Sequence, residues 1–108
     1  MIKVKFDYDT LVLSVTGHAQ TAEKGQDLVC AAASILVLTL AKNLELLLPE
    51  YGTVSTEIED GAALIAACIP DEEERDAVRT VFQTIVTGFL LLQEKAPEAV
   101  DVTVTFPD

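Results

Sequence analysis

Residues 28–48 read LVCAAASILVLTLAKNLELLL, and this stretch decides how the rest of the chain must be arranged. Residues 28–41 carry no charge and are apolar on nearly every side, so we expect a helix over 28–48 with Asp27 as its N-cap. Such a helix needs cover on most sides: a sheet on one side, and a second helix or a partner subunit on the other. Fourteen uncharged residues are fewer than the ~20 that a bilayer requires, so we predict a core helix.

The regions around this helix show the two-residue periodicity of strands. Apolar residues alternate with polar ones, and Asp60-Gly61 is a strong hairpin turn between two such runs. The predicted strands cover residues 2–6, 11–16, 54–59, 62–69 and 100–106; residues 49–52 end the first helix, and a second helix runs from Asp71 to Pro97. The order β-β-α-β-β-α-β predicts one α+β domain over residues 1–108, with a mainly antiparallel or mixed sheet and two helices packed on one face.

The composition limits the classes of partner and site. With 18 acidic and 7 basic residues among 108, the formal net charge is −11, which argues against nucleic acid and anionic membranes and favours a basic protein partner. Two cysteines are too few for a disulfide framework, and a single histidine makes a conventional metal site unexpected. The first residues, MIKVKFDYD, alternate like a strand and lack the apolar segment of a signal peptide, so we expect a cytoplasmic protein.

His18 and Cys30 form a candidate catalytic pair. His18 follows the second predicted strand and Cys30 lies near the start of the first helix, so the loop between them can close and bring them together. The thiolate is the nucleophilic form of cysteine, and the unpaired N–H groups and partial positive charge of a helix N-terminus favour it. A neighbouring imidazolium would favour it further, and the same N–H groups could donate to an oxyanion.

Each residue taken alone also has a simpler explanation. A cysteine in an apolar helix usually packs in the core, and a histidine at a strand end usually faces solvent. Asp27 is explained as a helix cap, Ser34 as a hydroxyl bonded to the carbonyl of Cys30, and Cys68 as a packing residue of a buried strand. The residues by themselves therefore leave the catalytic reading open.

Residues 17–34 read GHAQTAEKGQDLVCAAAS, and here the chain resembles a known family. Gly17-His18-Ala19, Ala22-Glu23-Lys24-Gly25, Asp27, Val29-Cys30-Ala31-Ala32 and Ser34 look like the signature of the ribosomal-processing cysteine protease Prp family. The spacing from His18 to Cys30, the length and the element order agree as well, so the resemblance covers essentially the whole chain.

The resemblance implies a cytoplasmic cysteine endopeptidase, typically a homodimer, that needs no cofactor and no metal. It would remove the N-terminal extension of large-subunit ribosomal protein number twenty-seven, cutting after a hydrophobic, phenylalanine-containing segment. Cys30 would be the nucleophile and His18 the general base and acid, with Asp27 and Ser34 as supporting residues. The substrate loop would comprise Gly17, Ala19, Gln20, Thr21, Ala22, Glu23, Lys24, Gly25 and Gln26, although Gln20-Thr21 departs from the small or aromatic residues expected in relatives.

Two other hypotheses accompany this one. The chain could be a dimeric module that binds or helps to assemble a ribosomal protein without cutting it, or Cys30 could serve as a thiol redox switch. The exposed side of the first helix would fit a dimer interface, with Leu36, Leu40 and Leu44 as candidates. The sequence assigns no third catalytic residue.

Overall fold

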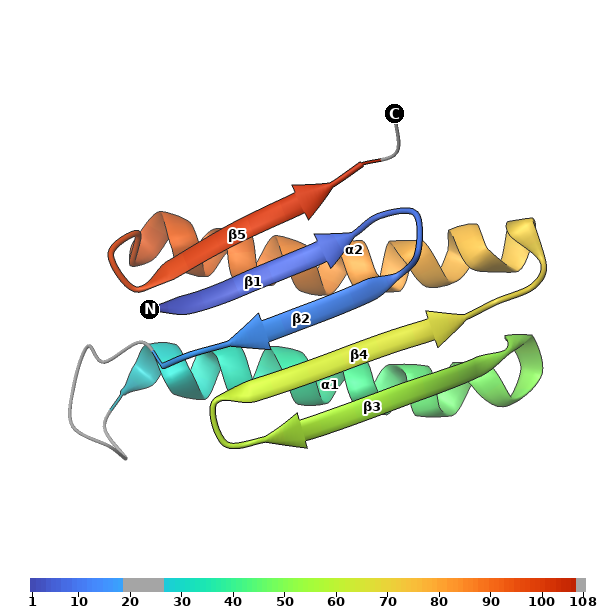
Figure 1. Ribbon diagram of the computed structural model, residues 1–108, viewed down its shortest axis with the longest axis horizontal. Helices are drawn as coiled ribbons and strands as arrows, with labels where there is room; N and C mark the ends of the chain where they lie inside the picture. Colours follow the sequence, from blue (N-terminus) through green and yellow to red (C-terminus); the bar gives the residue numbers. More distant parts are fainter. Residues whose placement is uncertain (19–26, 107–108) are drawn as a thin grey trace.

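The computed structural model describes residues 1–18 and 27–106, apart from the side chains of Pro49 and Tyr51. In chain order the elements are β1 (Ile2–Asp7), β2 (Val12–Thr16), α1 (Leu28–Tyr51), β3 (Thr53–Glu59), β4 (Ala62–Cys68), α2 (Glu72–Lys95) and β5 (Val100–Thr105). This is the predicted β-β-α-β-β-α-β order, and both helices lie on the same side of the sheet (Figure 1). The α+β prediction is therefore confirmed.

The five strands form one mixed sheet in the order β3-β4-β2-β1-β5. The pairs β1–β2, β2–β4 and β3–β4 are antiparallel, whereas β5 joins β1 in parallel. The chain can place β5 beside β1 because α2 runs back along the helix-covered face to the end of the sheet where β1 begins. The β2 and β3–β4 segments thereby meet at the end of the sheet where α1 begins (Figure 1).

The core lies between the sheet and the two helices. Alternate residues of the strands point into the core, where they meet the buried residues of α2, which include Val78, Phe82, Ile85 and Phe89. Phe6 stacks on Phe82 with ring centroids 5.4 Å apart. Because both sets of side chains are almost completely excluded from water, this contact fixes α2 against β1.

The face of α1 that is buried in the core is not the one that we expected. Leu40 and Leu44 are fully buried against the sheet, and Leu36 is half-buried near Gly88 of α2, so none of the three leucines forms an exposed dimer surface. The exposed apolar residues of α1 are instead Leu28, Ile35, Leu38 and Leu46. Sequence spacing alone could not tell these two faces apart, because leucines occupy both.

The ends of α1 follow from its capping residues. Asp27 is the N-cap as predicted, but the helix continues through Pro49 to Tyr51 and ends at Gly52, whose N–H donates to the carbonyl of Leu48 at 2.8 Å. Residues 28–48 are long and apolar enough to cross a membrane by length and composition alone, contrary to the estimate from residues 28–41. The core helix of a soluble protein passes the same test, and here Leu40, Leu44 and Leu48 pack into the core.

Candidate active site

A cavity of about 220 Å³ opens where the end of β2, the first turns of α1 and the β3–β4 turn come together. His18 and Cys30 both line it, so the fold brings the predicted pair to one place from two elements. Its walls are largely apolar, with side chains such as Val15, Val37 and Ile58. A cavity of this kind suits an extended peptide segment with an apolar side chain.

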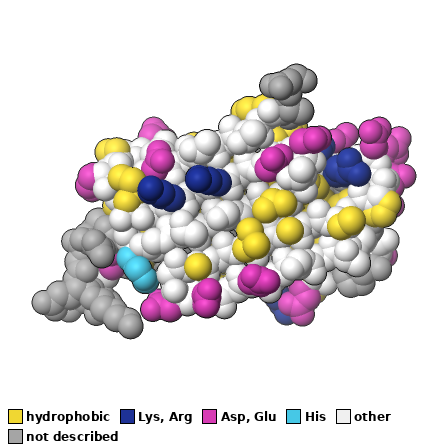
Figure 2. All heavy atoms as spheres, in the orientation of Figure 1, with side chains coloured by type: hydrophobic (Ala, Val, Ile, Leu, Met, Phe, Trp, Pro, Cys, Tyr) yellow, Lys and Arg dark blue, Asp and Glu magenta, His cyan; other side chains and the backbone are white. Residues whose placement is uncertain are grey.

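His18 is held at this position by the backbone that precedes it. Gly17 has φ +96°, a conformation that favours glycine, and its N–H donates to the carbonyl of Gly61 at 2.9 Å. This bond continues the pairing of β2 with β4 by one residue and ties the root of His18 to the β3–β4 turn. The imidazole itself is exposed, which leaves it open to substrate and solvent (Figure 2).

Cys30 is half-buried in the first turn of α1, and Asp27 organises that turn. The Asp27 carboxylate accepts hydrogen bonds from the backbone N–H groups of Val29 at 3.0 Å and of Cys30 at 3.1 Å. The carbonyl of Asp27 also accepts from the N–H of Ala31 at 3.1 Å. The backbone at Cys30 is therefore fixed by a cap, in agreement with the prediction that Asp27 is the N-cap.

The same cap changes the electrostatics that the sequence suggested. The N–H groups of Val29 and Cys30 already donate to a carboxylate, so they are not unpaired donors waiting for an oxyanion. The negative charge of Asp27 also offsets the partial positive charge of the helix end.

Ser34 lies one turn further along α1 and lines the same cavity. Its side chain is exposed, so it borders the opening of the cavity and does not support Cys30 from within the core. Gly17, also predicted for the substrate loop, lines the cavity too. The other predicted loop residues, 19–26, lie outside the described residues.

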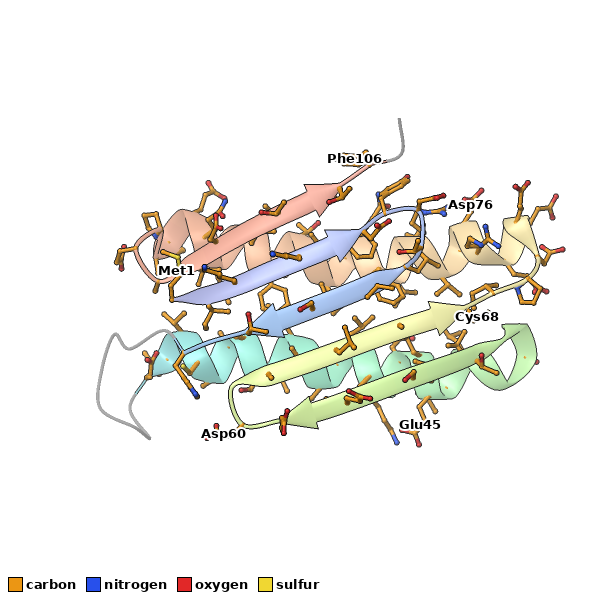
Figure 3. The ribbon with its side chains drawn as sticks, viewed as in Figure 1. Met1, Glu45, Asp60, Cys68, Asp76 and Phe106 are labelled. Carbon is orange, nitrogen blue, oxygen red and sulfur yellow. The ribbon has the colours of Figure 1, made fainter. Side chains whose placement is uncertain are left out.

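Cys68 is not part of this site, and the prediction that it packs in a buried strand is wrong. Its side chain is exposed at the end of β4 opposite Asp60 (Figure 3). Thr53 is its partner on the edge strand, and the even positions of β4 face away from the helices. The apolar sequence of β4 concealed this alternation, because alanine is common on both of its faces.

The β3–β4 turn contributes residues that the sequence analysis did not assign to the site. Glu59, Asp60 and Gly61 all line the cavity, and Asp60 projects at the end of the hairpin (Figure 3). In the sequence they read only as a hairpin turn, and nothing there indicated that it would fold back beside His18. Among residues 1–18 and 27–106, no group of histidine, cysteine and carboxylate side chains is arranged to hold a metal ion.

Comparisons with known proteins give this geometry a family. The Staphylococcus aureus essential ribosomal processing protease Prp, solved with a covalently linked product peptide, is similar at 21% identity and a TM-score of 0.82, over 97% of this chain and 100% of that chain. The structure of SMU.848 from Streptococcus mutans matches at 26% identity and a TM-score of 0.69, over 98% and 93%.

A search of curated proteins gave no match. The model of the cysteine protease Prp family, in contrast, matches residues 1–101, nearly the whole chain. The match extends over both hairpins, both helices and the cavity that holds His18 and Cys30. This chain belongs to the cysteine protease Prp family.

Proposed function

We propose that the protein is a cysteine endopeptidase that removes the N-terminal extension of bacterial large-subunit ribosomal protein number twenty-seven, cutting after a hydrophobic, phenylalanine-containing segment. The observation that carries this proposal is the meeting of His18 and Cys30 in one cavity, in a chain of the Prp family. The similar S. aureus protease is described as a ribosomal processing protease and was solved with a substrate peptide and with a covalently linked product peptide. That chemistry requires the two groups that the cavity provides.

In the proposed reaction, the Cys30 thiolate attacks the carbonyl carbon of the scissile peptide bond while His18 holds the proton. The tetrahedral intermediate collapses, the C–N bond breaks, and His18 gives its proton to the leaving amine. Water then attacks the thioester carbon while His18 accepts one of its protons. The C–S bond breaks, the carboxylic acid product leaves, and the Cys30 thiolate and the protonated His18 are regenerated. Each step uses only these two side chains and water, consistent with a thiolate–imidazolium pair.

The surroundings of the pair support a substrate that is both apolar and basic. The apolar walls suit a phenylalanine-containing segment, while Glu59 and Asp60 place two carboxylates on the cavity lining. The net charge of −11 would draw a basic ribosomal protein toward the enzyme from a distance. We place the reaction in the cytoplasm, where such a substrate is made.

A peptide-cleavage assay tests the proposal. The purified protein is incubated with a peptide that carries the hydrophobic processing segment, and the products are identified by mass spectrometry. We expect one cut after the phenylalanine-containing segment, with loss of cleavage in Cys30→Ala and in His18→Ala. Cys68→Ser is the matched control because Cys68 is an exposed cysteine outside the cavity, and it should retain full activity. Full activity in Cys30→Ala would exclude the mechanism.

The acidic surface also favours a second candidate function, a module that binds the ribosomal protein without cutting it. Such a module would bind the intact substrate equally well in the wild type and in Cys30→Ala, and the wild type would release no product. Product formation by the wild type excludes this alternative.

We also propose that the protein forms a homodimer, through the face of the sheet that no helix covers. Side by side across this face lie Lys5 on β1, Ser14 on β2, Leu64 on β4 and Glu57 on β3. Leu64 is 42% exposed, and Figure 2 shows carboxylates along the lower edge of the face, and lysines together with further carboxylates above the apolar centre.

This charge pattern is self-complementary for one orientation of a two-fold axis. An axis parallel to the strands brings β1 of one copy over β3 of the other, so that Lys5 faces Glu57 of the second copy twice. An axis across the strands would oppose lysine with lysine and is disfavoured. Sedimentation of the wild type as a monomer at micromolar concentration would contradict this proposal.

A further inference from the structure

We propose that Gly61 is a positioning residue for His18, because only a residue without a Cβ atom lets the imidazole rest against the β3–β4 turn. The contact is seen in the structure, and its catalytic consequence rests on the proposed function. A Cβ atom built on Gly61 would lie 2.7 Å from Nε2 of His18, 3.3 Å from Cε1 and 3.4 Å from Cδ2. A Cβ atom essentially never comes as close as the first of these distances to another heavy atom, so the ring or the turn would have to shift if position 61 carried a side chain.

The same glycine also holds the backbone at the root of the histidine. The carbonyl of Gly61 accepts a hydrogen bond from the N–H of Gly17 at 2.9 Å, and the adjacent residues Thr16 and Ala62 are paired in the sheet. Gly61 has φ +77°, as a tight two-residue hairpin turn requires at this position. One residue therefore sets both where the His18 backbone lies and which surface its ring rests on.

This support is important because the imidazole has little else to orient it. His18 is exposed, and within residues 1–18 and 27–106 its ring makes no hydrogen bond with a carboxylate. A cysteine–histidine pair without an orienting acid depends on packing to restrict the ring. The contact with Gly61 performs this task, and the ring atom nearest to it is Nε2, a nitrogen that can carry or accept a proton.

Replacing Gly61 by alanine tests the proposal, with Gly88→Ala as the matched control. Gly88 lies on α2 and does not line the cavity, and an added Cβ atom there would lie 2.6 Å from Cδ2 of Leu36, so this control introduces a comparable steric conflict away from the site. For Gly61→Ala we expect kcat for peptide cleavage to fall at least about tenfold with KM changed less than about threefold, since a misplaced general acid–base loses part of a ~10²–10⁴-fold contribution. Gly88→Ala should retain the kcat of the parent protein.

Two further measurements do not depend on cleavage. His18 is the only histidine, so its ring protons are identified directly by NMR, and the wild type should show a nuclear Overhauser effect between the Gly61 α-protons and the ring. In a Cys68→Ser parent, the rate of Cys30 alkylation against pH reports the thiolate. The profile of Gly61→Ala should move to higher pH, toward that of His18→Ala, while the carboxylates of Asp27, Glu59 and Asp60 stay the same in every variant.

The outcomes separate the two proposals. If the wild type cleaves no peptide but shows the nuclear Overhauser effect and the shift in alkylation, the positioning role stands and the proposed function fails. If Gly61→Ala keeps the parental kcat and alkylation profile, the positioning role is refuted whether or not the wild type is a peptidase. A circular dichroism spectrum and a urea midpoint near those of the parent show that Gly61→Ala is folded. If Gly61→Ala does not fold, the nuclear Overhauser effect in the wild type decides the question, and the absence of this effect would overturn the contact.

Discussion

The carboxylate of Asp27 acts on the first turn of α1 both as a hydrogen-bond acceptor and as a negative charge, and two substitutions separate these effects. Asp27→Ala removes the acceptor of both hydrogen bonds, 3.0 Å to Val29 N and 3.1 Å to Cys30 N. Asp27→Asn removes the charge but keeps a side-chain oxygen that can accept the same bonds. The two variants change the same position: Asp27→Ala removes the cap together with the charge, whereas Asp27→Asn keeps the size of the side chain and removes only the charge.

The structure gives a different magnitude for each variant. Loss of a helix N-cap costs ~1 kcal/mol, and loss of a carboxylate near a helix N-terminus costs about 0.3–1 kcal/mol more. We expect Asp27→Ala to lower the free energy of unfolding by about 1–2 kcal/mol and Asp27→Asn by less than about 1 kcal/mol. At roughly 4–8 °C for each kcal/mol in a domain of this size, Asp27→Ala should lower Tm by about 5–15 °C.

The effect on Cys30 should run in the opposite direction for the asparagine variant. With the cap kept and a neighbouring negative charge removed, the thiolate of Cys30 is stabilised. In a Cys68→Ser parent, Cys30 of the Asp27→Asn variant should therefore be alkylated faster than Cys30 of the parent at any pH below the midpoint of the alkylation profile. Urea denaturation gives the free energies of unfolding, and iodoacetamide kinetics against pH gives the thiolate fraction.

Two results would refute this reasoning. Equal destabilisation by Asp27→Asn and Asp27→Ala would show that the charge, and not the cap, accounts for the stability. Slower alkylation of Cys30 in Asp27→Asn would show that the carboxylate does not oppose the thiolate.

Three other predictions follow from the packing, the charges and the turns. Leu40→Ala should lower the free energy of unfolding by about 2–5 kcal/mol because Leu40 is fully buried, whereas Leu46→Ala, at a side chain 71% exposed, should stay within about 0.5 kcal/mol in the same urea titration. Hydrogen bonds from the backbone, chiefly the one from residue 10, lower the pKa of Asp7. The ionised carboxylate therefore stabilises the fold above the ordinary pKa of 3.8, and this stabilisation is lost as the pH falls through the lowered pKa. Asp7→Asn should reduce this loss of stability in acid, as measured by thermal melts from pH 5 to pH 2. Lys5→Glu should weaken the homodimer in sedimentation equilibrium, and adding Glu57→Lys should restore it; a dimer indifferent to both would place its interface elsewhere.

Most of the fold could be predicted from local sequence. The strands were visible as alternation, the Asp60-Gly61 turn as a hairpin signal, and both helix starts as the capping residues Asp27 and Asp71. These features depend on residues near one another in the chain, so they survive in almost any tertiary arrangement. The faces of α1 could not be predicted in this way, because leucine occurs on both the buried and the exposed face.

The candidate site divides in the same manner. The pairing of His18 with Cys30 was proposed from the sequence, since the resemblance to the Prp family rests on residues 17–34, and the cavity agrees with it. The capping role of Asp27 was also predicted, but its occupation of the N–H groups near the nucleophile required coordinates.

By itself, the sequence determined the order of elements and the family, and it proposed His18 and Cys30 as the reactive pair, because these depend on local pattern and on a short contiguous motif. Only the tertiary structure decided which residues surround that motif. β4 pairs with β2, and this pairing brings a turn more than forty residues away in the chain against His18. No local signal specifies such a contact, since it arises from strand pairing and core packing between distant segments. The glycine of an ordinary hairpin turn thus becomes, in the folded protein, the surface on which the imidazole rests.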